Sequence, residues 1–333
     1  MSTDVVVPSY ADDVVSDDRV TAWQASGLIV RGREPLTLDE IYERVPAIGS
    51  RVISSDVNAS PIDGTPGFIP APGWKANVRE DDNSVLGIVR GRYKIVQNRD
   101  AFAFGADILS QSGAFIDSAG VINNGGVVWV TMNMDHDVMV AGKSSERLGT
   151  YLLMSNGHDG KHGITAAVVT LRMACNNQFA VTLRDAVRKF TIRHTGDTDG
   201  RLMEARKALE ISFKYTDEIA KIGETLINQS YPQDYLEQFL TKVVPMPEDP
   251  SDRQITIVEN KRAAIASTLK TAPDLNDIRD TKWGLIQAVN DWENHQSRIR
   301  VTGNNDASAS RMARLVTGNQ TASQRALAVL TAA

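Results

Sequence analysis

Two short stretches gather most of the side chains whose chemistry suits binding or catalysis. The first is SNGHDGKHG at residues 155–163, and the second is RMACNNQF at residues 172–179. Imidazole, guanidinium and amide groups bind phosphate, and a thiol or an imidazole takes part in nucleophilic catalysis. The candidates in and just beyond these stretches are His158, Lys161, Arg172, Cys175, Asn176, Asn177, Arg193 and His194.

The second stretch is predicted to end a strand and to begin a helix at about 177–189. Asn176 is then a natural N-cap, and the backbone N–H groups behind it stay free at the positive end of the helix. Such an end binds phosphate. Charged side chains on a strand usually face solvent or a ligand, which adds Arg172, Arg193 and His194 to the site. We therefore expect one shared face, with His158 and Lys161 on the neighbouring hairpin. The residues on that face are Arg172, Asn176, Asn177, Arg193 and His194.

The single cysteine allows two interpretations. A helix N-terminus lowers the pKa of an adjacent thiol, so Cys175 is a candidate thiolate nucleophile with His194 as its base. A lone cysteine after the apolar run VVTLRMA is more often a small buried core residue. A reactive Cys175 should be essential for activity, whereas a buried one should tolerate alanine.

The first stretch is predicted to be a hairpin turn. Asn156-Gly157 and Asp159-Gly160 are strong turn dipeptides between two apolar strands. His158 and His162 therefore share no helical face, and a metal site needs at least three ligands. The sequence also lacks GxxxxGK[ST], GxGxxG after a strand, and HExxH. We expect no metal and no cofactor.

Periodicity predicts an α+β fold with a mixed or antiparallel sheet, followed by helices. The expected parts are an acidic flexible leader at 1–20, an α+β body at 21–200 and a helical part at 201–333. Residues 56–73, rich in proline and glycine, are predicted to be a loop. The expected strands lie within 85–96, 114–122, 126–135, 147–156, 164–174 and 190–195. The expected helices lie at 35–45, 98–113, 201–229, 231–244, 250–272, 280–300 and 322–333. Aromatic residues on or near these strands either stack nucleobases or belong to the core, and they are Tyr93, Trp129, Tyr151 and Phe190.

Charge is distributed unevenly along the 333 residues. The formal net charge is -5, yet residues 143–207 carry eleven Lys/Arg against six Asp/Glu. A basic middle suits a polyanionic partner, although clustering on a solvated face explains it equally well. One cysteine excludes an internal disulfide and fits a reducing cytoplasm. With no signal peptide and no long apolar run, we expect a cytoplasmic protein without membrane contact.

Several ordered motifs carry a family likeness. They are VLGIVRGRYKIVQNRDAFAF, SAGVINNGGVVWV, SNGHDGKHGITAAVVTLRMACNNQF, IRHTG and DTKWGLIQAVNDWENH. In these motifs the sequence resembles the phage/plasmid-like proteins of the domain of unknown function 932. The resemblance implies a phage, plasmid or bacterial-host context and supplies no reaction.

Three functions follow as hypotheses. The leading one is binding of single-stranded nucleic acid during replication or recombination of a mobile element, because of the local basic surplus. The second is an enzyme acting on nucleotides or nucleic acid, with Cys175, His158 and His194 as candidates. The third is a non-catalytic protein that engages a host protein through its helical part. Oligomerisation is compatible with each of them.

Overall fold

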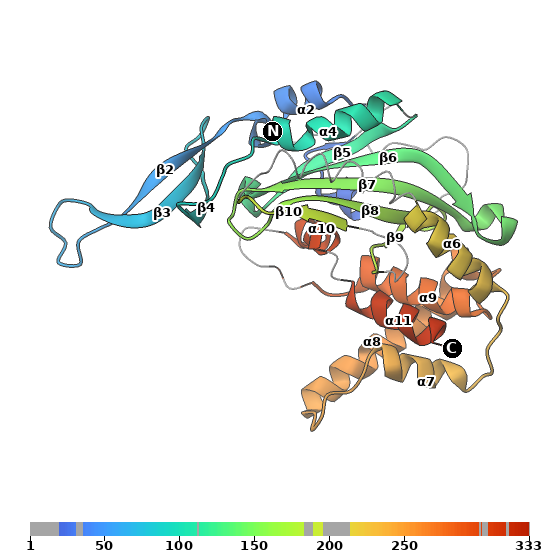
Figure 1. Cartoon of the computed structure of the whole chain (residues 1–333). Helices are drawn as coiled ribbons and strands as arrows, with labels where there is room; N and C mark the ends of the chain where they lie inside the picture. The colour runs from blue at the N-terminus through green and yellow to red at the C-terminus, as the bar shows by residue number, and fades with distance from the viewer. Residues whose placement is uncertain are drawn as a thin grey trace.

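The computed structural model describes residues 20–30, 36–111, 113–182, 189–195, 214–299, 301, 306–317 and 320–332. A large antiparallel sheet forms the centre of the molecule, helices cover it, and a three-stranded arm projects from one end (Figure 1). Nearly all of the expected acidic leader at 1–20 lies outside the described residues.

The large sheet has the strand order β1-β5-β6-β7-β8-β10, and β9 pairs with residues 170–172 at the C-terminal end of β8. Its strands are β1 (Ile29–Val30), β5 (Phe115–Ile122), β6 (Val127–Met139), β7 (Arg147–Gly157), β8 (Ile164–Arg172), β9 (Asn177–Phe179) and β10 (Lys189–Ile192). Every residue of β8 is buried, and so is every residue of β7 except Arg147. The central strands are therefore covered on both faces, which explains their almost continuous apolar sequences.

Side chains alternate between the two covered faces, as a strand requires. Val128, Val130 and Leu152 pack against α2, α3 and α4. Trp129 and Leu153 point the other way, toward α1 and α10. The helices of these two layers are α1 (Ala22–Ser26), α2 (Leu38–Arg44), α3 (Pro46–Gly49), α4 (Asn98–Gln111) and α10 (Ala307–Thr317).

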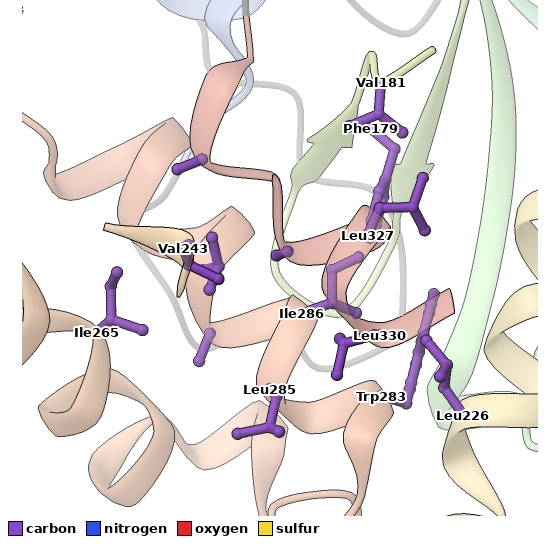
Figure 2. Packing of buried hydrophobic residues seen from close by; sticks show 14 of the residues in the cluster. Phe179, Val181, Leu226, Val243, Ile265, Trp283, Leu285, Ile286, Leu327 and Leu330 are labelled. Carbon is purple, nitrogen blue, oxygen red and sulfur yellow. The ribbon is translucent and has the colours of Figure 1, made fainter. Parts of the chain in front are cut away.

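A second group of helices shares one core with the end of the sheet. These helices are α6 (Lys214–Ile227), α7 (Tyr235–Val243), α8 (Asp252–Thr271), α9 (Lys282–Asp291), which continues as a π-helical turn at Trp292–Gln296, and α11 (Thr321–Thr331). Figure 2 shows three residues of this core, which are Phe179 of β9, Trp283 of α9 and Leu327 of α11. The rings of Phe179 and Trp283 stack with centroids 5.8 Å apart. The core thus contains residues from both the strand-rich and the helical parts.

The arm is a separate antiparallel sheet with the order β2-β3-β4. Its strands are β2 (Val52–Ala59), β3 (Ile69–Arg79) and β4 (Val85–Arg90). The prediction of a loop at 56–73 is therefore wrong at both of its ends. Proline disfavours a central strand, but Pro70 and Pro72 lie beyond Trp74, where β4 no longer pairs with β3. An edge strand tolerates proline because the missing N–H is not needed for pairing.

The base of the arm approaches the body closely. A Cβ on Gly87 of β4 would lie 2.5 Å from the Cα of Asp159, in the turn between β7 and β8. No side chain fits between these two backbones, so glycine permits the contact. The arm is thereby fixed beside the SNGHDGKHG hairpin.

The α+β class with an antiparallel sheet is confirmed. The predicted helix at 35–45 is confirmed as α2, where Thr37 and Glu40 form a capping box. Residues 214–227 of the expected helix at 201–229 form α6, while 201–213 lie outside the described residues. The division at residue 200 stays a prediction. No helix among the described segments is long and apolar enough to cross a membrane.

Candidate functional site

The two ends of β8 separate the residues that we expected on one face. Arg172 pairs with Leu148 and Asn177 at one end of the strand. Ile164, at the other end, pairs with Ile192 beside Arg193. Eight residues of strand span about 26 Å at roughly 3.3 Å per residue. The prediction of one shared face is therefore wrong, and the candidates form two groups.

Arg172 is completely buried and bound to internal partners. Its Nε donates to Glu146 Oε2 at 2.8 Å, and its Nη2 donates to Glu146 Oε1 at 2.5 Å. The carboxylate of Asp274 accepts a hydrogen bond from Nη1 at 2.6 Å, and the backbone oxygen of Asp274 accepts one from Nη2 at 2.8 Å. Nη1 also lies 3.1 Å from Cys175 Sγ. All five N–H donors are therefore used. In this structure Arg172 joins the sheet to the helical part and has no donor left for phosphate.

The residues after Arg172 do not begin a helix. Asn176 has φ +55° and closes a turn, and β9 begins at Asn177 and pairs with β8. The predicted helix start is thus wrong, and with it the phosphate site on its free N–H groups. Asn177 is completely buried and donates its Nδ2 to Gln287 O at 3.3 Å. Asparagine suits an N-cap and a positive-φ turn equally well, so the sequence alone does not separate them.

Cys175 is also completely buried. Burial raises the pKa of its thiol, so the group is neutral at physiological pH. Both the burial and the protonation oppose the nucleophile hypothesis. The structure instead favours the alternative of a small core residue beside Arg172.

His158 and His194 lie together at the opposite end of β8. Their ring centroids are 6.4 Å apart, and His194 stacks on Tyr93 at 4.7 Å. Burial lowers the pKa of His158 to about 4, with a further contribution from His194, and burial likewise lowers the pKa of His194. Both imidazoles are therefore neutral near pH 7 and contribute no positive charge to an anion site.

These histidines belong to a buried network that holds the arm against the body. Asn98 Oδ1 accepts from Asn156 Nδ2 at 2.9 Å and from His158 Nε2 at 2.8 Å. Asn77 of β3 donates to the backbone oxygen of His158 at 2.7 Å. His194 Nδ1 donates to the backbone oxygen of Lys94 at 3.2 Å. The His158 ring thus holds the side chain of Asn98, and the His194 ring holds the backbone at Lys94, so both histidines have a positioning role.

The same network brings exposed basic residues together. Lys94 N donates to His194 O at 2.9 Å, which places the chain after β4 beside Arg193. Lys161 follows Gly160, which packs closely against β4. A Cβ added to Gly160 would lie 3.0 Å from a methyl carbon of Val89. We call the exposed group at this junction the basic patch, and it comprises Arg90, Arg92, Lys94, Lys161 and Arg193.

Few carboxylates oppose the basic patch. In segments 85–94, 158–163 and 189–195 the only acidic residue is Asp159. Its oxygens accept from the backbone N–H groups of Lys161 and His162 at 2.9 Å each, and from the ring of His162 at 2.7 Å. Among the described residues, no ion pair involves Arg92, Lys161 or Arg193. Their charges remain available to an anionic partner.

An exposed tryptophan beside the patch was missed in the sequence. Trp74 of β3 is 38% exposed, and the guanidinium of Arg90 lies 3.9 Å from its ring centroid. The usable signal is an aromatic residue next to Lys75, directly after the loop predicted at 56–73. By contrast, Trp129 and Tyr151, which were considered for base stacking, are buried in the core.

Metal binding finds no support in the described part of the chain, where no three His, Cys, Asp or Glu side chains are close enough to hold an ion. The neighbours of His158 and His194 are side-chain and backbone amide groups, which include Asn98, Asn156 and the backbone of Lys94. The chemistry of this end of the sheet is therefore that of neutral polar groups beneath exposed cations.

The fold and the basic patch define an α+β protein with an antiparallel sheet, a helical layer on each face and a projecting β-arm. The family model described as Domain of unknown function (DUF932) matches residues 85–316, and the chain belongs to this family. The resemblance of the sequence motifs to the domain of unknown function 932 is thus confirmed. Comparisons with curated proteins and with solved structures found no match. The matched segment contains the whole basic patch, whereas β2 and β3 precede it.

Proposed function

We propose that this protein binds single-stranded nucleic acid at the basic patch. The observation that carries the proposal is the exposure of Arg92, Lys161 and Arg193 at one junction without carboxylate partners among the described residues. Three chain segments converge there, and a rigid buried network fixes them. Phosphate groups bind such clusters of Lys and Arg, because binding releases condensed counterions.

Single strands suit the site better than duplex. Non-specific binders of single strands combine a basic groove with aromatic rings on which unpaired bases stack. Trp74 supplies such a ring beside the patch, and Arg90 of the patch lies over it. No side chain of the patch is positioned by a base-reading helix, so we expect little sequence preference. Replication or recombination of a phage or plasmid is the context that the sequence resemblance suggests for this binding.

The alternative of an enzyme has less support. Its central candidate, Cys175, is buried and protonated, and His158 and His194 lie at the other end of β8. A nucleophile must lie within hydrogen-bond reach of its base. These three residues are too far apart to act on one substrate.

The test is fluorescence anisotropy with a labelled oligonucleotide of mixed sequence at several salt concentrations. With about three phosphate contacts, log K should fall with log salt at a slope of about −2. Lys161→Gln with Arg193→Gln should weaken binding to all sequences and make the slope shallower by about 1.4. The matched control is Arg253→Gln with Lys261→Gln, which removes the same charge from the exposed surface of α8. Equal losses in both double variants would attribute binding to net charge and not to the patch.

A further inference from the structure

Trp74 is unusual among the tryptophans of this chain. Trp23, Trp129 and Trp283 are each no more than 1% exposed, and Trp292 is half-buried against the helical core. Trp74 is 38% exposed on the arm, where it lies opposite Arg90. A large aromatic side chain on a surface strand loses the benefit of burial unless a partner covers it.

The outer face of the arm that carries Trp74 is covered at Ala76 and Val78 but left open by the described residues at Ile53, Trp74 and Ile88. Cross-strand pairs place Ile53 opposite Val78, and Ile88 opposite Ala76, on the same face as Trp74. The exposed apolar residues of the arm are Ile53, Ile62, Phe68, Ile69, Trp74, Val85 and Ile88. The opposite face, with Val52, Asn77 and Val89, is buried. Burial of only one face at the base leaves the other available for a partner.

Charge decides which partner fits. At the base of the arm, Arg90 covers the ring of Trp74, and Arg92 follows at the basic patch. Lys75, one residue nearer the base than Trp74, lies on the opposite face of β3 and is paired with Asp56 at 2.6 Å, so it adds no net positive charge to the face of Trp74. A partner must therefore carry anionic groups at the base and flat apolar groups along the arm. A single strand of nucleic acid has both, as phosphates and unpaired bases.

We propose that the Trp74–Arg90 pair stacks an unpaired nucleobase of a strand whose phosphates lie on the basic patch. This inference rests on the proposed function and specifies its single-strand preference. The indole and the guanidinium plane both offer flat surfaces for a base, and the cation–π contact holds them together with the guanidinium 3.9 Å from the ring centroid. A base within a duplex is already stacked on its neighbours and cannot occupy this position.

The experiment compares Trp74→Ala and Trp74→Phe with wild type. Binding is measured by anisotropy with a single-stranded oligonucleotide and with its duplex, at several salt concentrations. Trp74→Ala should weaken single-strand binding roughly 5- to 150-fold, the effect of losing one stacked base, while the salt slope stays unchanged. Trp74→Phe should retain most of the affinity, and duplex binding should be equally weak in all three proteins. Quenching of the exposed Trp74 emission by the oligonucleotide should disappear in both variants.

Two results would overturn the inference. Unchanged single-strand affinity in Trp74→Ala, combined with a loss in the Lys161→Gln and Arg193→Gln variant, removes the stacking role and leaves the proposed function standing. A reduced sedimentation mass of Trp74→Ala together with weaker binding assigns the outer face to contact between copies of the chain. Failure of wild type to bind any oligonucleotide at low salt is a different result, because it removes the proposed function itself.

Discussion

Arg172→Met tests whether the buried arginine stabilises the fold and has no part in binding. The substitution removes the cation between Glu146 and Asp274 and leaves a similar side-chain volume. Glu146 is 1% exposed on its side chain and Asp274 is 10% exposed, so water cannot replace the lost partner. Trp283 Nε1 still donates to Glu146 Oε2 at 2.7 Å, but one neutral donor does not compensate a buried carboxylate.

The magnitude follows from this burial. Removing one member of a buried ion pair costs about 3–5 kcal/mol, because the remaining charge has no partner. Two carboxylates share this arginine, so we expect the upper part of the range. For 333 residues with an unfolding entropy of about 2.1 cal/mol/K per residue, the melting temperature should therefore fall by about 6–7 °C.

The assay is thermal unfolding followed by circular dichroism, with oligonucleotide binding measured below the transition. Arg147→Met is the matched control, because Arg147 pairs with Asp137 at a half-exposed position. That surface pair should contribute no more than about 1 kcal/mol. A melting temperature of Arg172→Met within 1 °C of the control would refute the structural role. Lost binding in a variant of native stability would instead return Arg172 to the phosphate site.

Three further predictions concern the buried groups and the arm. Cys175→Ala should cost about 1 kcal/mol in the free energy of unfolding and leave oligonucleotide affinity intact; a folded variant without affinity would favour the enzyme hypothesis. The pKa of His158 is about 4 in the folded state against 6.5 in the unfolded state, so only the unfolded state gains this proton as pH falls from 6.5 toward 4. The free energy of unfolding should therefore decrease over this window by up to about 3 kcal/mol. Urea titrations at pH 7.5 and pH 5 should show a smaller decrease in His158→Gln. An identical pH dependence in both proteins would contradict this prediction. Gly87→Ala should destabilise the protein by about 1–3 kcal/mol and speed amide exchange in β4, because its Cβ would lie 2.7 Å from His158 O, whereas Gly91→Ala, with 3.7 Å to its nearest atom, should do neither.

Local signals in the sequence predicted much of the fold. Thr37 and Glu40 have the capping-box spacing, and α2 begins there. The Asn-Gly and Asp-Gly turns between apolar runs predicted the hairpin of β7 and β8. The arm was missed because its prolines lie where β3 is an edge strand, which depends on pairing that the sequence does not display.

The candidate site was only partly predictable. Lys161 and Arg193 were identified, and the structure places both on the exposed junction beside the arm. The role of Arg172 was missed because Asp274 lies 102 residues away along the chain. A buried arginine and a ligand-binding arginine have the same letter, and only the fold shows which carboxylates surround it.

The central claim is that the basic patch binds single-stranded nucleic acid, and one measurement tests it most directly. Anisotropy titrations of a labelled single strand at 50 and 200 mM salt compare wild type with the Lys161→Gln and Arg193→Gln double variant. We predict binding by wild type that weakens with salt, and affinity lower by about 5- to 30-fold in the double variant at low salt. Equal affinities of the two proteins, or no binding by wild type at 50 mM salt, would contradict the account.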